Sequence, residues 1–169
     1  MQRKIAIVGP ESTGKTMLTG LLATHYKAGM VKEVAREYID ALSRNYVLDD
    51  LVAIARLQLE EEDKASREQT IVFCDTNLAV VKIWAEFVFG TCPTFIDRNF
   101  KERRYDLHLL THIDLPWEPD PQREHPQHRA ELFARYKNLL DHNQLPYHII
   151  TGMGDQRVSN AISLLDNFL

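Results

Sequence analysis

Cysteine is scarce in this 169-residue chain, which contains only two, Cys74 and Cys92. Two cysteines are too few for the disulfide framework of a small secreted domain, and they suit a reducing compartment. Long hydrophobic runs are also missing, because no apolar stretch approaches the roughly 18 residues that a transmembrane helix requires. The apolar run at 5–8 is far too short for the core of a signal peptide. These absences predict a cytoplasmic protein without a membrane-spanning segment.

Positive charge shows no excess over negative charge: 20 Lys and Arg residues stand against 24 Asp and Glu residues, and the net charge is −4. A general binder of nucleic acids or anionic membranes needs an excess of basic residues to neutralise phosphates, so neither is an expected partner. Hydrophobic residues make up 44% of the chain and charged residues 26%, the balance of an ordinary globular protein. The length predicts one domain over residues 1–169. The sequence carries no signal for an oligomeric state.

What the sequence does contain is an alternation of apolar runs with segments of helical period. Continuous apolar runs that include β-branched residues are typical of strands buried on both faces of a parallel sheet. They occur at 5–8, 71–74, 107–110 and 148–150, with a weaker candidate at 30–32. Segments with a helical period occur at 15–27, 49–68, 77–89, 127–142 and 156–168. This alternation predicts right-handed crossovers and a three-layer α/β fold around a mostly parallel five-stranded sheet.

The segment at about 114–128 interrupts this alternation. It holds four of the seven prolines and has neither helical nor strand periodicity. Long irregular segments inside compact domains are usually functional. We expect this segment to be a lid that brings Arg123 and, just after it, Arg129 to the functional site.

The most informative stretch is a phosphate-binding loop. Its eight-residue pattern is matched at every fixed position by Gly9, Pro10, Glu11, Ser12, Thr13, Gly14, Lys15 and Thr16. A predicted strand precedes the loop and a predicted helix follows it, which is the context that the pattern requires. The glycines let successive N–H groups point at one phosphate, and the helix N-terminus adds partial positive charge. Lys15 is predicted to neutralise the β- and γ-phosphates of ATP, and the Thr16 hydroxyl to ligate Mg²⁺.

The sequence also contains a carboxylate at the position where a residue that orients Mg²⁺ is expected. Asp75 closes the predicted strand at 71–74, and its position suits the acidic residue that orients Mg²⁺ directly or through water. The alternative is that Asp75 caps the helix that follows, and the two roles are compatible.

The surrounding residues distinguish three classes of nucleotide-binding protein. A GTPase should carry an Asn-Lys-x-Asp motif that reads guanine, and the sequence has none. A mechanical ATPase should have Asp-Glu at the end of the metal strand, whereas Asp75 is followed by Thr76 and Asn77. A small-molecule kinase needs an acceptor-side carboxylate and an arginine-bearing lid that excludes water. The sequence favours the kinase. The alternatives are a regulatory module that senses ATP and a nicotinamide ligand without turnover, and an ATPase without an acceptor.

Candidates for the acceptor side follow the weaker strand. Glu33, Arg36 and Glu37 come after its carboxyl end, where parallel sheets bind ligands. A carboxylate there can accept the proton of a ribose hydroxyl, and an arginine can hold a phosphoryl oxygen. The alternative is a solvated first helical turn, where glutamate is simply favourable. Either Glu33 or Asp75 can be the base, and the sequence does not choose between them.

Several motifs, in this order, resemble a known family. They are Gly9 to Thr16, Glu33-Val34-Ala35-Arg36-Glu37-Tyr38, Phe73-Cys74-Asp75-Thr76, Pro116-Trp117-Glu118-Pro119-Asp120 with Arg123, and Leu145-Pro146-Tyr147. Together they span nearly the whole chain and resemble the ribosylnicotinamide kinase domain of the NadR family. The resemblance implies a P-loop kinase-like fold and transfer of the γ-phosphate of ATP, with Mg²⁺, to the 5′-hydroxyl of nicotinamide riboside, which gives nicotinamide mononucleotide. The adenylyltransferase domain that usually precedes this domain has no counterpart before the loop, so a stand-alone kinase is expected.

These observations together nominate the site residues. Catalytic roles are expected for Lys15, Glu33, Arg36, Asp75 and Arg123. ATP contacts are expected from the phosphate-binding loop, from Arg129 and from Gly152 in the turn after the last strand. The candidates for binding a small nucleoside-type acceptor are Glu33, Glu37, Tyr38, Asn77, Trp84 and Trp117. Aromatic residues at helical spacing are more often core residues, which is the alternative for Trp84.

Three positions depart from the family pattern. The family usually reads Asp-Thr-Asp after the metal strand, and Asn77 replaces the second acid. Its lid commonly has Asp-Gly, whereas Pro121 follows Asp120. Some members carry an aromatic residue where this chain has Lys32. These changes leave the expected ATP site intact and concern the acceptor.

Overall fold

Within residues 2–169, which the computed structural model describes, five parallel strands form one sheet in the order β2-β3-β1-β4-β5. The strands are β1 (Arg3–Val8), β2 (Gly29–Val31), β3 (Ile71–Asp75), β4 (Leu107–Thr111) and β5 (Tyr147–Ile150). All five predicted strands are present and the sheet is wholly rather than mostly parallel, but the edge strand β5 is not buried on both faces as expected, because His148 and Ile149 are exposed. The central strand β1 pairs with β3 on one side and β4 on the other, so the loop that follows β1 lies between the ends of these two neighbours.

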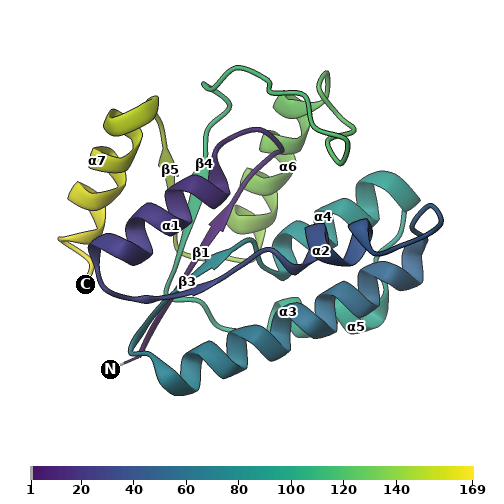
Figure 1. The fold of residues 1–169 in the computed structure, drawn as a ribbon, viewed down its shortest axis with the longest axis horizontal. Coiled ribbons are helices and arrows are strands. Elements are labelled where there is room, and N and C mark those ends of the chain that lie inside the picture. Colours follow the sequence, from purple (N-terminus) through teal and green to yellow (C-terminus); the bar gives the residue numbers. More distant parts are fainter. Residues whose placement is uncertain (1) are drawn as a thin grey trace.

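The same described residues form seven helices that cover both faces of the sheet. They are α1 (Lys15–His25), α2 (Val34–Asp40), α3 (Leu48–Glu68), α4 (Leu78–Phe89), α5 (Thr94–Glu102), α6 (Arg129–His142) and α7 (Gly154–Leu165). Figure 1 shows α1 and α7 together on one face and the other helices on the opposite face, where α4 packs against α3, α5 and α6. The predicted three-layer architecture is therefore confirmed.

Two of these helices are absent from the sequence prediction. The helix α2 has seven residues, with Ala35 as its buried residue, and α5 has nine, with Ile96 and Phe100 buried one turn apart. Both helices are short, and helices of this length are marginal on their own, so tertiary packing stabilises both of them.

Local signals fix where the long helices begin and end. Asn77 caps α4, because its Oδ1 accepts the backbone N–H of Ala79 at 2.9 Å. The same helix ends at Gly90, whose φ of 69° is the left-handed conformation that glycine adopts without strain. The predicted first helix ends earlier than expected, at His25, because Lys27 takes a φ of 49°.

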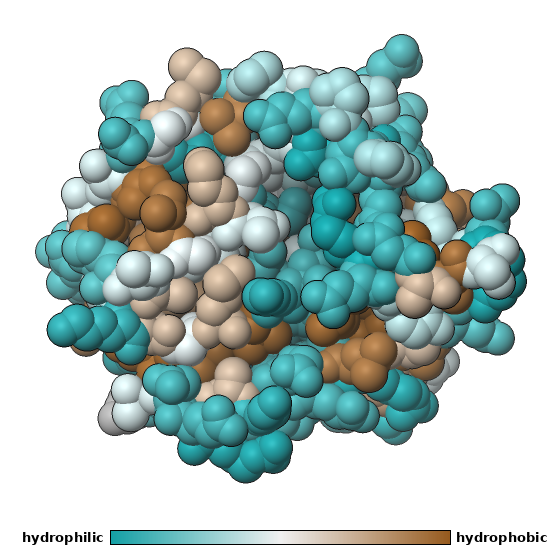
Figure 2. Space-filling view, viewed as in Figure 1, coloured by the Kyte–Doolittle hydropathy of each residue, from teal (hydrophilic) through white to brown (hydrophobic). Residues whose placement is uncertain are grey.

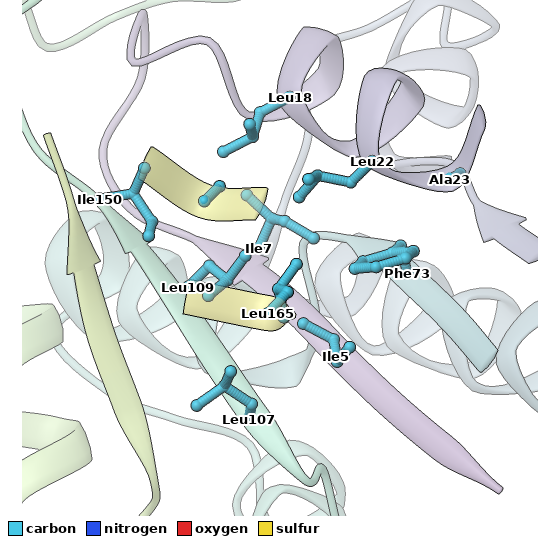
Figure 3. Close-up of a cluster of buried hydrophobic side chains, with 11 residues drawn as sticks. Ile5, Ile7, Leu18, Leu22, Ala23, Phe73, Leu107, Leu109, Ile150 and Leu165 are labelled. Carbon is cyan, nitrogen blue, oxygen red and sulfur yellow. The ribbon is translucent and has the colours of Figure 1, made fainter. Parts of the chain in front are cut away.

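One apolar layer holds α1 and α7 against the sheet, and a second holds helices against one another. In Figure 3 the side chains of Ile5, Ile7 and Leu109 lie in one cluster with Leu18 and Leu22 of α1 and Leu165 of α7. All six side chains have no exposed surface, so each contributes roughly 1.5–3 kcal/mol of burial free energy. A second buried layer joins α3, α4 and α5 through residues that include Leu51, Ile54, Leu78, Ala85, Ile96 and Phe100. The two layers make a rigid platform beneath the carboxyl ends of the strands.

Residues 112–128, between β4 and α6, form no helix or strand and include the segment predicted to be a lid. In Figure 1 this segment arches over the carboxyl ends of the strands, on the same side as the loop after β1.

None of the helices in residues 2–169 is long and apolar enough to cross a membrane. The face of the molecule in Figure 2 carries hydrophobic residues in separate small groups among hydrophilic ones.

A buried histidine gives the fold a predictable dependence on pH. His108 in β4 is 1% exposed. Burial lowers the pKa of its imidazole from 6.5 to about 4, although the hydrogen bond of Nδ1 with the Pro146 carbonyl raises it. Between these two pH values the unfolded chain binds a proton that the folded chain does not. The neutral His108 side chain therefore contributes its full stabilisation at pH values above 6.5, its pKa in the unfolded chain. This stabilisation is lost as the pH falls toward about 4, its pKa in the folded protein.

The loss from this one group is expected to reach roughly 3 kcal/mol of unfolding free energy. Chemical denaturation at several pH values between about 7 and 4 measures it. Replacement by a residue that cannot titrate, His108→Asn, should flatten the pH dependence in this window. A variant that keeps the full slope of the wild type would show that other groups cause the loss.

Candidate functional site

The loop after β1 has the backbone of an anion-binding concavity. Gly9 has a φ of 141°, and a Cβ at this position would lie 2.5 Å from Thr111 Oγ1, so only glycine fits. Ser12 and Gly14 have φ values of 55° and 75°. These left-handed residues turn successive peptide N–H groups toward one side of the loop, which is the geometry of a phosphate-binding nest. The predicted phosphate-binding loop therefore has the required shape.

Buried hydroxyl groups hold this loop against the sheet. The Thr13 hydroxyl lies 2.8 Å from the Pro10 carbonyl, to which it donates, and 2.7 Å from Thr111 Oγ1. Thr111 also donates to the carbonyl of Val8 at 3.1 Å. The helix α1 begins directly after the loop and has no acidic residue in its first turn. Its positive end is therefore free to stabilise an anion.

Lys15 lies over the loop and faces two carboxylates. Its Nζ donates to the Pro10 carbonyl at 2.8 Å. Burial lowers the pKa of Lys15, while the negative charges of Glu33 and Asp75 raise it. The ammonium group of Lys15 is a compact positive charge. An incoming phosphate can replace the Pro10 carbonyl as its hydrogen-bond acceptor.

Asp75 ends β3 directly beside β1, in register with Ile7. The side chain is 1% exposed, and neither of its oxygens has a hydrogen-bond partner within the described residues. Burial raises the pKa of Asp75, whereas the nearby Thr16 hydroxyl and Lys15 lower it. Two unsatisfied carboxylate oxygens beside a hydroxyl suit a hard cation such as Mg²⁺. A buried carboxylate without partners is otherwise costly, which points to a ligand rather than a structural role.

Thr16 and Asp75 are the candidate metal ligands among the described residues. No group of three or more His, Cys, Asp or Glu side chains suited to a metal occurs in the part of the chain that the structure describes. Mg²⁺ bound to nucleotides typically uses one or two protein oxygens, with phosphates and water supplying the others, so Thr16 and Asp75 are sufficient. The helix-capping alternative for Asp75 is wrong, because Asn77 caps α4 instead.

Glu33 is brought to the opposite side of the loop by β2. It is the residue immediately before α2, and it lines the same cavity as Lys15. Burial raises the pKa of Glu33, Asp75 raises it further, and Lys15 and Arg36 lower it. A carboxylate with a raised pKa that faces a cavity is suited to accept a proton. Glu33 thus lines the cavity at the start of α2, whereas Glu37 in the first turn of the same helix is exposed to solvent.

The cavity has a volume of about 1010 Å³ and runs from the phosphate-binding loop to a cluster of aromatic side chains. We call Tyr46, Trp84, Phe87 and Phe89, which line this end, the aromatic wall. Tyr46 packs edge-on against Trp84 with ring centroids 5.0 Å apart, and Trp84 Nε1 donates to the Tyr46 hydroxyl at 3.2 Å. The wall offers flat apolar surface for a ring-shaped ligand.

The sequence patterns did not identify Tyr46 or the lid residue Glu124 as site residues. The Tyr46 hydroxyl donates to Glu124 at 2.7 Å, which ties the aromatic wall to the lid. Tyr46 lies in the irregular stretch between α2 and α3, which has no motif. A tyrosine in a loop between two helices is the only local signal that could have drawn attention to it.

The lid contacts the phosphate-binding loop at Glu11 and Ser12. Ser12 Oγ accepts the Glu118 N–H at 2.8 Å and lies 3.4 Å from Arg123 Nη1. The Glu11 carboxylate accepts the backbone N–H of His125 at 3.1 Å. Arg123 also donates to the Glu118 carbonyl, and it lines the cavity. The lid thus holds an arginine over the loop.

The lid also contacts the acceptor side. Arg36, at the rim of the cavity, forms an ion pair with Asp120 at 3.1 Å. Gln122 donates to the backbone carbonyl of Arg36 at 3.1 Å and to the Asp40 side chain. This segment therefore contacts both the phosphate-binding loop and α2, and so bridges the two sides of the cavity.

Several predicted residues lie away from the cavity lining. Tyr38 donates to Asp50 at 3.1 Å, and Glu37 is exposed on α2. Asn77 is fully buried and caps α4. Trp117 is half-buried in the lid. None of these four residues lines the described cavity, so their predicted contacts with an acceptor lack geometric support.

Arg129 and Gly152 also lie outside the lining. Arg129 donates to the carbonyls of Leu115 and Ser12, both at 2.9 Å, and so joins the lid to the loop. Gly152 follows β5 with a φ of 99°, and its N–H donates to Asp114 at 2.7 Å. The structure gives both residues positions that support the loop, and their predicted contact with ATP stays a prediction.

The strand order, the nest of amides with Lys15, and the covering lid define a P-loop α/β domain of the nucleotide-kinase type. A family model described as an AAA domain matches residues 4–157, and the chain belongs to that family.

Two curated relatives are similar to this chain over most of its length. They are the trifunctional NAD biosynthesis/regulator proteins NadR of Salmonella typhimurium and Escherichia coli, each 26% identical over 124 residues. The matched region is 70% of this chain but only 30% of each relative. These matches confirm the predicted resemblance to the NadR family. They concern only the part of each relative that this chain covers, which is less than a third of its length.

Solved structures share the fold. A NadR protein in complex with NR has a TM-score of 0.81 at 23% identity, over 99% of this chain and 51% of that chain. A thymidylate kinase from Ehrlichia chaffeensis has a TM-score of 0.69 at 14% identity, over 99% of both chains. These likenesses establish that the fold is that of P-loop kinases.

Proposed function

We propose that this protein transfers the γ-phosphoryl group of ATP to the 5′-hydroxyl of a nucleoside, with nicotinamide riboside as the acceptor. The observation that carries the proposal is that Glu33 and Lys15 face one cavity between the phosphate-binding loop and the aromatic wall. A phosphate cradle alone serves any nucleotide-binding protein, whereas an opposing carboxylate with a raised pKa is what an acceptor hydroxyl needs. The similarity to the NadR proteins supports nicotinamide riboside in particular.

The donor side consists of the loop and Lys15. The amides of the nest and the N-terminus of α1 hold the phosphates, and Lys15 exchanges its bond to the Pro10 carbonyl for the β- and γ-phosphoryl oxygens. Thr16 and Asp75 would hold Mg²⁺, which neutralises phosphate charge when bound. Because these groups are fixed before the substrate arrives, they need little reorganisation during the reaction.

The acceptor side consists of Glu33 and the aromatic wall. The hydroxyl oxygen attacks the γ-phosphorus and forms a new O–P bond, while the bond from that phosphorus to the bridging oxygen breaks and ADP leaves. Glu33 takes the proton of the hydroxyl as the bond forms, so that charge balances. Glu33 is the better base of the two carboxylates, because it lines the cavity and Asp75 does not.

The lid supplies the remaining charge and keeps water out. Arg123 lies over the loop, and Arg36 lies at the rim beside Asp120. With ligands bound, both guanidinium groups can approach the transferring phosphoryl group, where they stabilise its oxygens. Excluding water matters because water would otherwise compete with the nucleoside hydroxyl.

A panel of nucleosides tests the proposal. The protein is incubated with ATP, Mg²⁺ and one nucleoside at a time, and ADP and phosphorylated nucleoside are quantified. We expect equal amounts of both products with nicotinamide riboside and little with adenosine, cytidine or thymidine. Release of ADP without any acceptor would instead indicate an ATPase, and binding without turnover would indicate a sensing module.

The lid role of Arg123 has its own test. Arg123→Ala is expected to lower kcat by about 10²-fold, because the arginine stabilises charge that develops only in the transition state. ATP affinity should fall much less. Steady-state kinetics together with ATP titration measure the two quantities. Equal losses in kcat and in ATP affinity would argue against a lid role.

A further inference from the structure

Arg157 in α7 is a charged residue that the proposed mechanism does not use. It is 0% exposed and is one of the largest fully buried side chains in the described residues. Burial lowers the pKa of its guanidinium, but arginine remains charged in proteins. Burying a charge is costly unless hydrogen bonds compensate it, so the partners of this group indicate what it is for.

Backbone carbonyls supply most of those partners. Nη1 donates to the Thr13 carbonyl at 2.7 Å, Nε to the Gly152 carbonyl at 2.8 Å and Nη2 to the His112 carbonyl at 3.1 Å. Nη2 also pairs with the Asp114 carboxylate. One guanidinium therefore connects the phosphate-binding loop, the end of β4, the root of the lid and the turn after β5.

The bond to Thr13 has a direct electrostatic consequence for the loop. The Thr13 carbonyl belongs to the same trans peptide as the N–H of Gly14, and the two groups point in opposite directions. A cation on the carbonyl side polarises this peptide and makes its N–H a stronger donor. Gly14 has a left-handed φ and lines the cavity. Arg157 thus lies on the side of this peptide away from its N–H.

We propose that Arg157 is a positioning residue for the phosphate-binding loop, which fixes the Thr13–Gly14 peptide so that its N–H is directed at the phosphates of the bound nucleotide. The inference rests on the proposed donor site but not on any particular acceptor. It predicts that the contribution of Arg157 to nucleotide affinity comes through the phosphates and not through the adenosine part.

Calorimetric titration with three ligands tests this role. The titrants are ATP, inorganic tripolyphosphate and adenosine, each with Mg²⁺, and the proteins are the wild type and Arg157→Lys. A lysine keeps the charge, but its single nitrogen cannot span the three carbonyls that Nε, Nη1 and Nη2 of the guanidinium hold separately. We expect affinity for both ATP and tripolyphosphate to fall about tenfold, because a charge-assisted hydrogen bond is lost. Adenosine affinity should not change. Arg67→Lys, at an exposed position near the end of α3, is the matched control and should bind all three as the wild type does.

The melting temperature of each variant separates positioning from simple stability. A lower melting temperature with unchanged tripolyphosphate affinity would overturn the inference, and so would a loss confined to adenosine. A wild-type protein that binds no tripolyphosphate would overturn it as well. In contrast, a wild type that binds tripolyphosphate but phosphorylates no nucleoside would refute the proposed function and leave this inference standing.

Asp114→Asn keeps the proposal testable if Arg157→Lys does not fold. This variant removes the ion pair but leaves the guanidinium and its three backbone acceptors. Tripolyphosphate affinity should stay within about threefold of the wild type, because the Thr13 bond remains. A loss of tenfold or more would show that the ion pair, and not the bond to Thr13, sets the loop, and would overturn the inference.

Discussion

Lys15→Ala is expected to reduce kcat/KM for phosphoryl transfer by about 10³-fold or more, because the lysine is a preorganised charge at the phosphates. In the free protein, the one hydrogen bond that Lys15 Nζ makes within residues 2–169 goes to the Pro10 carbonyl, so loss of the side chain removes little structure. The circular dichroism spectrum should therefore match that of the wild type. Initial rates of ADP formation with saturating acceptor measure the effect.

The matched control for this variant is Lys137→Ala. Lys137 is an exposed lysine of α6, paired with Asp141 at 2.8 Å. It should keep wild-type rates within about twofold, since exposed ion pairs contribute little. A Lys15→Ala protein that is folded and turns over at the wild-type rate would remove Lys15 from the mechanism.

The second prediction with a large effect distinguishes the role of Glu33 from that of Asp75. Glu33→Gln is expected to lower kcat by about 10²–10⁴-fold with little change in ATP affinity, because an amide cannot accept the proton. Asp75→Asn should instead raise the Mg²⁺ concentration needed for half-maximal rate. It should also raise the melting temperature of the ligand-free protein, because the carboxylate it replaces is buried without a hydrogen-bond partner.

The pH profile gives these two variants an independent check. Burial raises the pKa of Glu33, and a base must be deprotonated to act. The wild-type kcat should therefore rise with pH through a pKa above that of an ordinary glutamate. Glu33→Gln should lose this limb of the profile. If Asp75→Asn loses it and Glu33→Gln retains it, the roles of the two carboxylates are reversed.

The sequence was sufficient for the sheet and for the donor side of the site. Strands buried on both faces need continuous apolar runs, and the run at 71–74 also places Asp75 beside the loop. The phosphate-binding loop is equally local, because one contiguous stretch supplies the glycines, Lys15 and Thr16. Such features are visible in a sequence because neighbouring residues create them.

The acceptor side depends on contacts between distant residues, which the sequence pattern does not reveal. Tyr46 meets Trp84 only because α4 packs against α3, and Tyr46 alone of the two bonds to the lid residue Glu124. Arg157 is separated by 144 residues from Thr13, whose carbonyl it holds. The sequence predicts that Asn77 contacts the acceptor. In the structure its side chain instead caps the N-terminus of α4 and is buried inside the fold.

The fate of the γ-phosphoryl group tests the central claim most directly. The protein is mixed with ATP, Mg²⁺ and nicotinamide riboside, and phosphorus NMR follows each phosphorus with time. Transfer across the cavity predicts that the γ signal of ATP is replaced by a phosphomonoester signal of the nucleoside, in step with ADP. Appearance of inorganic phosphate instead, at a rate that does not depend on the nucleoside, would contradict the account.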